Sequence, residues 1–196
     1  LSGDAGDELF GGYNRYFFAT KVWDSYRLVP SAVRKTLLSS IFLLKPKTWD
    51  ATLGNLVKKR GIVHLGDKLY KLGQRLQGVE NFNELYLGLV TDKFYLNSLL
   101  KNNHDLPYFL KDESRWPKLS DNVEKMMALD TLTYLNDDIL VKVDRAAMST
   151  SLELRAPFLS HPVFEYAWKL PMDKKIRGNK GKWVLRQVLY RHVPQE

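Results

Sequence analysis

Apolar residues recur three and four positions apart over most of the chain, which is the spacing of amphipathic helices. The pattern predicts one helix that follows the opening loop, is capped by Asp7 or a neighbour, and runs to about Tyr26. A second is predicted from Ser31, its candidate N-cap, to Lys45. Another helix is predicted around Leu65, and a short one over residues 92–100. The core candidates of this half are Phe10, Tyr13, Phe17, Phe18, Val33, Leu37, Ile41, Leu44, Leu65, Leu69, Leu72, Leu76, Phe82, Leu85, Tyr86 and Leu89.

Capping signals mark the starts of two further helices. Asn81 and Asp121 are each followed, three residues later, by a glutamate, Glu84 or Glu124, as in a capping box. No stretch shows a convincing run of alternating apolar and polar residues, so strands are not predicted. The residues present are therefore expected to be mainly α.

Asp130 lies among apolar residues on a predicted buried helix face. The face is marked by Val123, Met126, Met127 and Tyr134. A carboxylate in such a place must be hydrogen-bonded, paired or protonated, because an unpaired buried charge is very unfavourable. We expect Asp130 to be paired with an arginine or with backbone donors, and a direct catalytic role is the alternative.

Charged residues are interleaved with apolar ones between Asp137 and Arg155. Lys142, Asp144 and Arg145 are among them, and the pattern is compatible with an ordinary charged helix face. Glu153 and Arg155 stand among apolar neighbours, which predicts a buried ion pair that fixes a loop. His161, at the start of the next predicted helix, is expected to be a capping or surface group.

The composition of the 196-residue chain, with 44% hydrophobic residues, is typical of one soluble globular domain. There is no cysteine, so no disulfide or thiolate metal site is expected, and no apolar stretch is long enough to span a membrane. The net charge of +8 is spread over nearly all segments without a nucleic-acid-binding motif. We therefore expect no nucleic-acid or membrane partner and a cytoplasmic location.

The first sixteen residues, LSGDAGDELFGGYNRY, form an acidic, glycine-rich stretch. Three carboxylates, Asp4, Asp7 and Glu8, lie within five positions, and ionising all of them requires a cation or donors to share the charge. Gly11 and Gly12 each cost a helix about 1 kcal/mol relative to alanine. They therefore indicate close approach of another backbone or a ligand. The alternative is an acidic turn that only caps a helix.

Two lysines stand at the start of the last predicted helix. Lys180 and Lys182 precede the apolar positions Val184, Leu185 and Val188. Ammonium groups beside the free N–H groups of a helix N-terminus make a site for phosphate or pyrophosphate. The alternative is two solvated lysines. If the acidic loop met these lysines around one polyphosphate, the carboxylates could hold the bridging Mg²⁺.

Three stretches together resemble one enzyme family. LSGDAGDELFGGYNRY, LNDDILVKVDRAAMSTSLELRAPFL and the K-x-x-L-R pattern of residues 182–186 are similar to the C-terminal half of the synthetase domain of glutamine-hydrolysing asparagine synthetases. The resemblance implies the C-terminal helical part of an α/β, parallel-sheet domain like the adenine-nucleotide alpha-hydrolases, within the ATP-pyrophosphatase superfamily. Residues 1–196 are expected to form a single unit of that domain.

The resemblance also implies a reaction. Aspartate attacks the α-phosphorus of ATP to give β-aspartyl-AMP and pyrophosphate, and ammonia from a glutaminase domain then displaces AMP. ATP and Mg²⁺ are the implied cofactors, and a homo-oligomer is compatible with the family. The family's glutaminase domain and its SGGxDS loop are absent from these residues. The chain is therefore expected to be a fragment that is inactive alone.

Family roles are carried to matching positions of this sequence. Ser2 and Gly3 would contact the AMP portion, Asp4 would assist formation or aminolysis of the acyl-adenylate, Asp7 would hold Mg²⁺-pyrophosphate, and Lys182 would stabilise the charge of the leaving group. Lys180 is added as a further phosphate-binding candidate. The supporting residues are predicted to be Glu8, Asp130, Asp144, Arg145, Glu153 and Arg155.

The sequence departs from the family at two places. Asp4 stands where glutamate is common, and Ser160 replaces the aspartate of the family's PFLD pattern, which should change helix capping more than chemistry. The alternatives are a related amide ligase, either β-lactam synthetase-like or from a gene cluster, and a non-enzymatic, basic helical interaction module. A tyrosine near Asp4 would be expected in the β-lactam branch, so Asp4 favours intermolecular amination.

Overall fold

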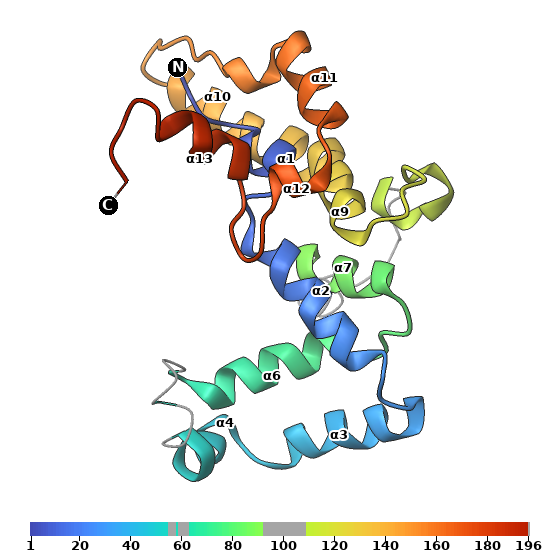
Figure 1. Ribbon diagram of the computed structural model, residues 1–196. Coiled ribbons are helices and arrows are strands. Elements are labelled where there is room, and N and C mark those ends of the chain that lie inside the picture. The colour runs from blue at the N-terminus through green and yellow to red at the C-terminus, as the bar shows by residue number, and fades with distance from the viewer. Residues whose placement is uncertain (55–57, 59–62, 92–108, 196) are drawn as a thin grey trace. The chain divides into compact units, whose positions relative to one another are not determined.

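The computed structural model describes residues 1–54, 58, 63–91 and 109–195 (Figure 1). Over these residues the regular secondary structure is helical, and one isolated antiparallel bridge joins Arg177 to Lys180. The expectation of a mainly α chain is confirmed for this part. Its α/β context stays a prediction, and the helix expected over 92–100 lies outside the described residues. No described helix is long and apolar enough to cross a membrane.

The chain divides into two compact units. Unit 1 comprises residues 1–20 and 104–196, and unit 2 comprises residues 21–103. Neither a change of composition nor a glycine- or proline-rich linker marks this division in the sequence. The expectation that residues 1–196 belong to one domain stays a prediction.

The single helix expected up to Tyr26 is two helices. α1 (Gly6–Phe10) starts after Ala5 at φ 69° and ends at Gly11, whose φ of 67° takes the chain out of helical conformation. α2 (Asn14–Tyr26) then begins a separate helix. The two helices are separated at Gly11, because a residue without a Cβ adopts a left-handed φ at little cost. The N-cap of α1 is Ala5, which provides no side-chain hydrogen bond, and Asp7 lies in the first turn of the helix.

Among the described residues, unit 2 contains the end of α2 and five further helical segments. They are α3 (Ser31–Leu43), α4 (Pro46–Trp49), the π-helical η1 (Asp50–Gly54), α6 (Leu65–Leu76) and α7 (Phe82–Val90). The Asn81 side chain accepts a hydrogen bond from the Glu84 N–H, so the predicted cap of α7 is confirmed. Phe82, Leu85 and Tyr86 are buried as expected.

The core predicted for α3 is wrong. Val33, Leu37 and Leu44 are 46%, 54% and 40% exposed, and no residue of α3 is buried. Ser31 is the first helical residue, while Pro30 stands at the N-cap without a side-chain hydrogen bond. Helical spacing of apolar residues identified the helix, but it does not show whether a second element covers the apolar side.

The second half of the chain completes unit 1. It contains the 3₁₀ turns η2 (Phe109–Lys111), η3 (Glu113–Arg115) and η5 (Pro157–Leu159), the π-helical η4 (Thr131–Ile139), and the helices α9 (Asn122–Asp130), α10 (Leu140–Met148), α11 (His161–Lys169), α12 (Met172–Lys175) and α13 (Trp183–Leu189). α9, η4 and α10 follow one another without a break. The Asp121 side chain accepts from the Glu124 N–H, which confirms the predicted cap of α9.

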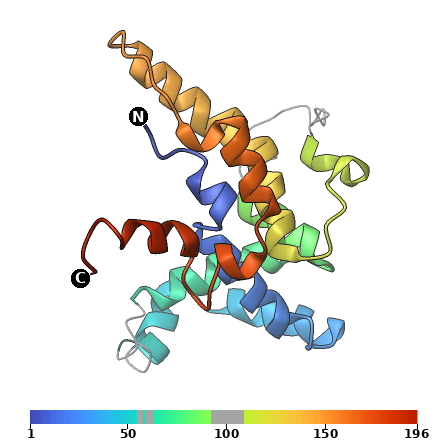
Figure 2. The ribbon, with the colours of Figure 1, turned by 45° about the horizontal axis from the view of Figure 1, so that its top comes forward.

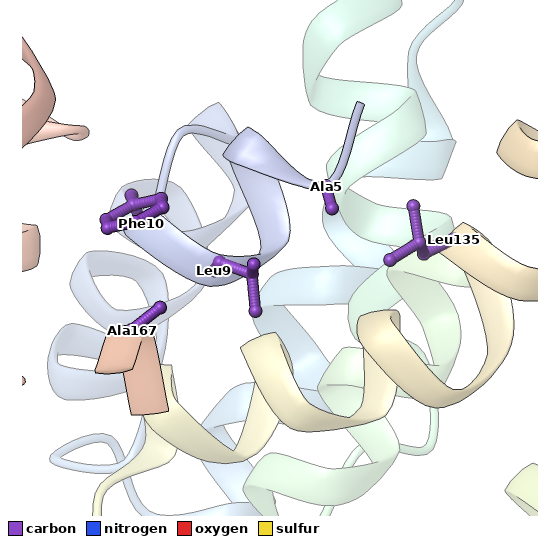
Figure 3. Packing of buried hydrophobic residues seen from close by; sticks show 5 residues of the cluster. All are labelled: Ala5, Leu9, Phe10, Leu135 and Ala167. Carbon is purple, nitrogen blue, oxygen red and sulfur yellow. The ribbon is translucent and has the colours of Figure 1, made fainter. Parts of the chain in front are cut away.

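The short helix α1 lies in the interior of unit 1. Figures 1 and 2 show it beside α9, α11 and α13, and it also contacts η4. Figure 3 shows the buried cluster formed where these segments meet. Its fully or nearly fully buried members are Ala5, Leu9, Phe10, Leu135 and Ala167. The acidic loop is therefore held in place by apolar residues of its own helix.

A buried ion pair joins α2 to α9 within unit 1. The Asp130 side chain is 0% exposed, and its Oδ2 lies 2.8 Å from an amino nitrogen of Arg15. Arg15 Nε and the Tyr16 hydroxyl donate to the same oxygen at 2.9 and 2.7 Å. The Arg15 guanidinium also lies over the Tyr13 ring, 4.1 Å from its centroid. The expected pairing of buried Asp130 with an arginine is confirmed.

Replacing Asp130 with alanine should destabilise the fold strongly, because the largely buried Arg15 guanidinium would lose its counter-charge. Breaking a buried ion pair by removing one partner costs about 3 kcal/mol or more. Urea denaturation of the two proteins measures the loss. Asp137→Ala, at an exposed position, is the control and should change the free energy of unfolding by less than about 0.5 kcal/mol. An equal effect of both substitutions would contradict this interpretation of Asp130.

Candidate anion-binding site

The segment 176–182 packs closely against the end of α1. The Lys182 N–H donates to the Phe10 carbonyl at 2.8 Å. A Cβ on Gly181 would overlap the Gly11 carbonyl oxygen, and a Cβ on Gly11 would lie 2.6 Å from side-chain atoms of Ile176. A larger residue at Gly181 would therefore separate the two backbones, and one at Gly11 would displace the Ile176 side chain. The predicted close approach of another backbone is found at Gly181, while the space beside Gly11 is filled by the Ile176 side chain.

This contact places the two predicted halves of the site together. Lys182 Nζ lies 3.0 Å from Asp7 Oδ1, and both side chains are about one-third exposed. A Cβ on Gly12 would overlap Asp7 Oδ1 and lie against Lys182 Cε. Gly12 therefore leaves the space that the ion pair occupies. Residues at opposite ends of the sequence meet at one point of unit 1.

A cavity of about 380 Å³ opens beside this ion pair. Its lining residues are Asp7, Gly12, Asn14, Phe17, Asn179, Lys180, Gly181, Lys182, Arg186 and Tyr190. Three cationic side chains and one carboxylate line it, so its formal charge is positive. Groups of this kind attract a polyanion, and amide and hydroxyl groups on the same walls can donate hydrogen bonds to it.

Lys182 and Lys180 reach the cavity from the turn before α13. Lys182 is the N-cap of that helix and has a φ of 55°, while Lys180 forms the bridge with Arg177 through backbone hydrogen bonds of 3.0 and 3.1 Å. The sequence prediction that both lysines precede the last helix is confirmed. A tight turn therefore sets the backbone from which both side chains reach the cavity.

Four polar residues of the cavity were not predicted from the sequence. They are Asn14, Asn179, Arg186 and Tyr190. Arg186 was visible as the arginine of the K-x-x-L-R pattern, and it follows Lys182 by four residues, the spacing that puts two side chains on one helix face. Its Nε donates to the Gly181 carbonyl at 3.0 Å. The other three carry no sequence signal, since they are brought in by the tertiary fold.

Ser2, Gly3 and Asp4 are not among the residues that line this cavity. Ser2 Oγ donates to Asp4 Oδ2 at 2.7 Å, and the Ser2 N–H donates to the Arg155 carbonyl at 2.8 Å. This second bond joins the opening loop to the SLELRAPFL stretch. The ring of Phe158 from the same stretch packs against Gly6 and forms an edge-on contact with Phe10. All three sequence stretches thus meet around α1.

The predicted buried pair of Glu153 and Arg155 is exposed. The two side chains are 2.6 Å apart but 74% and 75% exposed, so that prediction is wrong. They lie in a segment without regular secondary structure, and their apolar neighbour Leu152 is itself 61% exposed. Asp144 and Arg145 are also exposed, on α10, and do not line the cavity. The supporting roles of these four residues stay predictions.

Glu8, next to Asp7, is directed into the protein. Its side chain is buried, and the Tyr13 hydroxyl donates to its Oε1 at 2.6 Å. Burial raises the pKa of Glu8, and the neighbouring charges of Asp7 and Asp130 add to this, although the Tyr13 hydrogen bond opposes it. Burial and the Glu8 carboxylate likewise raise the pKa of Tyr13. Of the three clustered carboxylates, Asp7 reaches the cavity, whereas Glu8 is hydrogen-bonded to Tyr13 in the interior.

The carboxylate arrangement suits a Mg²⁺ ion held together with a phosphate ligand. No group of three or more histidine, cysteine, aspartate or glutamate side chains is placed to bind a metal among the residues described. Mg²⁺ in nucleotide-binding sites is commonly held by one or two carboxylates plus phosphate oxygens and water. Asp7, at the edge of a cationic cavity, fits that type of site.

The site is a cationic cavity with one carboxylate at its edge, an arrangement typical of proteins that act on phosphorylated ligands. A family model described as asparagine synthase matches residues 1–196. The chain therefore belongs to the asparagine synthase family.

Two relatives from Bacillus subtilis (strain 168) illustrate the similarity. The glutamine-hydrolyzing asparagine synthetase 1 is 31% identical over 195 residues, which are 100% of this chain and 28% of the relative. The glutamine-hydrolyzing asparagine synthetase 3 is 37% identical over 70 residues, 33% of this chain and 11% of the relative. The chain thus spans only about 28% of the length of the first relative. No solved structure matches the chain.

Glu8→Gln should change how stability depends on pH. Because the pKa of Glu8 is raised in the folded state, that state binds more protons than the unfolded one between the unfolded pKa and the folded pKa. The free energy of unfolding therefore falls as pH rises through this window, and Glu8→Gln should remove that decline. Glutamine keeps an oxygen that can accept from Tyr13.

Denaturation of both proteins in EDTA, at steps from about pH 4.5 to pH 8, measures this effect. Glu80→Gln, at an exposed position, is the control and should leave the slope unchanged. Parallel curves for wild type and Glu8→Gln would show that the pKa of Glu8 does not differ between folded and unfolded protein.

Proposed function

We propose that this chain is part of an enzyme that uses ATP to convert aspartate into asparagine, with ammonia derived from glutamine. Family membership supports this activity. The observation that carries the proposal is the meeting of Asp7 and Lys182 at 3.0 Å on a cationic cavity. An acidic turn and two solvated lysines would not need to share one site.

In the proposed reaction, the side-chain carboxylate of aspartate attacks the α-phosphorus of ATP. The bond from the α-phosphorus to the bridging oxygen breaks, which gives β-aspartyl-AMP and pyrophosphate. Ammonia then attacks the acyl carbon, and AMP leaves as the amide forms. Both steps are substitutions, and neither requires an oxidant or a reductant.

Lys182 is proposed to stabilise the charge that develops on the departing pyrophosphate. Its ammonium is one-third exposed at the cavity, and its backbone is held by the hydrogen bond to Phe10. A cation fixed where charge develops lowers the barrier without reorganising during the reaction. Lys180 and Arg186 line the same cavity and are proposed to bind the other phosphate oxygens.

Asp7 is proposed to hold the Mg²⁺ that accompanies pyrophosphate. Bound Mg²⁺ would supply charge neutralisation between phosphate oxygens. In the protein described here, Asp7 is paired with Lys182. On binding of the polyphosphate, the Asp7 carboxylate would turn to the metal and the Lys182 ammonium to the phosphate, so each charge would exchange one partner for another.

The residues outside the cavity are proposed to act on the other side of the reacting phosphorus. Ser2 and Gly3 would contact AMP, and Asp4 would take part in forming or aminolysing the acyl-adenylate. The hydrogen bond from Ser2 to Asp4 supports this by showing that the Asp4 carboxylate is held in a defined orientation. Glu8 and Asp130 would stabilise the loop from the interior. Asp144, Arg145, Glu153 and Arg155 would shape the surroundings.

ATP–pyrophosphate exchange dependent on aspartate tests the first step in the complete protein. Asp7→Asn and Lys182→Met should each lower the exchange rate by about 100-fold or more, the effect typical of removing a charge-stabilising group. Lys169→Met, at an exposed position on α11, is the matched control and should keep nearly full activity. Thermal denaturation of each variant checks that the fold is retained.

Two outcomes would contradict the proposed function. The first is failure of the wild-type protein to exchange pyrophosphate into ATP in the presence of aspartate. The second is ATP–pyrophosphate exchange by Asp7→Asn and Lys182→Met as fast as that by Lys169→Met. Asparagine formation from glutamine and from ammonium salts, measured separately, identifies the nitrogen source. Exchange supported by another carboxylic acid, but not by aspartate, would indicate a related amide ligase.

A further inference from the structure

Lys175, the last residue of α12, is fully buried in unit 1. Its Nζ lies 4.7 Å from the centroid of the Trp168 ring on α11. Among the described residues, Nζ has no hydrogen-bond partner. The Glu124 carboxylate on α9 attracts it electrostatically. An ammonium group is therefore enclosed between three helices, with an aromatic face and a carboxylate as its favourable surroundings.

Stability alone does not account for a lysine at this position. Burial lowers the pKa of Lys175, which shows that the charged form is disfavoured, and Glu124 opposes this only in part. A cation over an aromatic ring returns less free energy than full burial of an ammonium costs. Methionine has a similar length and would occupy the space without that cost.

The position of Lys175 in the chain connects it to the anion-binding site. The next residue, Ile176, packs against Gly11 at the end of α1. The turn closed by Arg177 and Lys180 follows, and the segment ends at Lys182, bonded to the Phe10 carbonyl. A shift of α12 along its axis would therefore displace the whole segment that presents Lys182.

We propose that Lys175 is a positioning residue for Lys182: by holding its ammonium over Trp168 it fixes the register of segment 176–182 against α1. This inference rests on the proposed function, in which Lys182 contacts the polyphosphate. An ammonium has a preferred position over a ring face, whereas an apolar side chain in the same space has no such preference. A displacement of Lys182 by as little as 1 Å would weaken its contact with a developing charge.

Hydrogen exchange of the complete, ligand-free protein tests the positioning directly. In Lys175→Met, amides of segment 177–183 should exchange at least about fivefold faster than in wild type, while those of α9 stay unchanged. Lys175→Arg keeps a cation for the Trp168 ring and should restore slow exchange. Lys174→Met is the matched control, since Lys174 is an exposed neighbour on α12, and it should have no effect.

ATP–pyrophosphate exchange gives a second readout. Lys175→Met should lower kcat by about tenfold with little change in the KM for aspartate, and Lys175→Arg should recover most of it. The thermal midpoint of Lys175→Met should equal or exceed that of wild type. Trp168→Leu leaves the lysine but removes the ring, and it should reproduce the local increase in hydrogen exchange.

Several results would overturn the proposal. The first is an unchanged rate of hydrogen exchange for segment 177–183 in Lys175→Met. The second is a uniform increase in hydrogen exchange across unit 1. The third is an equal increase in hydrogen exchange, or an equal loss of kcat, in Lys175→Arg and Lys175→Met. If Lys175→Met does not fold, unchanged exchange in Trp168→Leu overturns it. Absence of ATP–pyrophosphate exchange in wild type would refute the proposed function instead, because the hydrogen-exchange comparison needs neither substrate nor catalysis.

Discussion

Close contact between two backbones is the constraint on which the candidate site depends. Segment 176–182 meets α1 where Gly11 and Gly181 leave no room for a Cβ, and the Lys182 N–H bonds to the Phe10 carbonyl. Because Asp7 lies one turn earlier in α1, this contact brings its carboxylate within 3.0 Å of the Lys182 ammonium. The ion pair follows from the packing of the backbone.

The interior of unit 1 supports this contact through apolar and ionic interactions. Leu9 and Phe10 anchor α1 in the core, and the Asp130–Arg15 pair ties the start of α2 to α9. Neighbouring carboxylates of the acidic loop therefore have separate environments. Glu8 is buried with Tyr13, whereas Asp7 is exposed to the cavity. The short helix α1 separates them, since consecutive helical residues point in different directions.

Sequence reasoning identified the features that depend on local chemistry or on paired signals. The caps at Asn81 and Asp121, the buried Asp130 and the close approach at Gly11 are of this kind. The expected meeting of the acidic loop with Lys182 is also found, while a shared ligand stays a prediction. Sequence reasoning was wrong where exposure depends on distant elements: α3 buries no side chain, and Glu153 and Arg155 are on the surface. Asn14, Asn179 and Tyr190 reach the cavity only through tertiary packing.

The Mg²⁺ dependence of pyrophosphate binding tests the central claim, that Asp7 and Lys182 are two halves of one Mg²⁺-pyrophosphate site. Isothermal titration of pyrophosphate into the complete protein, with Mg²⁺ and with EDTA, provides the measurement. We expect tight binding by wild type only with Mg²⁺, and weak, Mg²⁺-independent binding by Asp7→Asn. Equal binding by wild type and Asp7→Asn, with the same response to Mg²⁺, would contradict it.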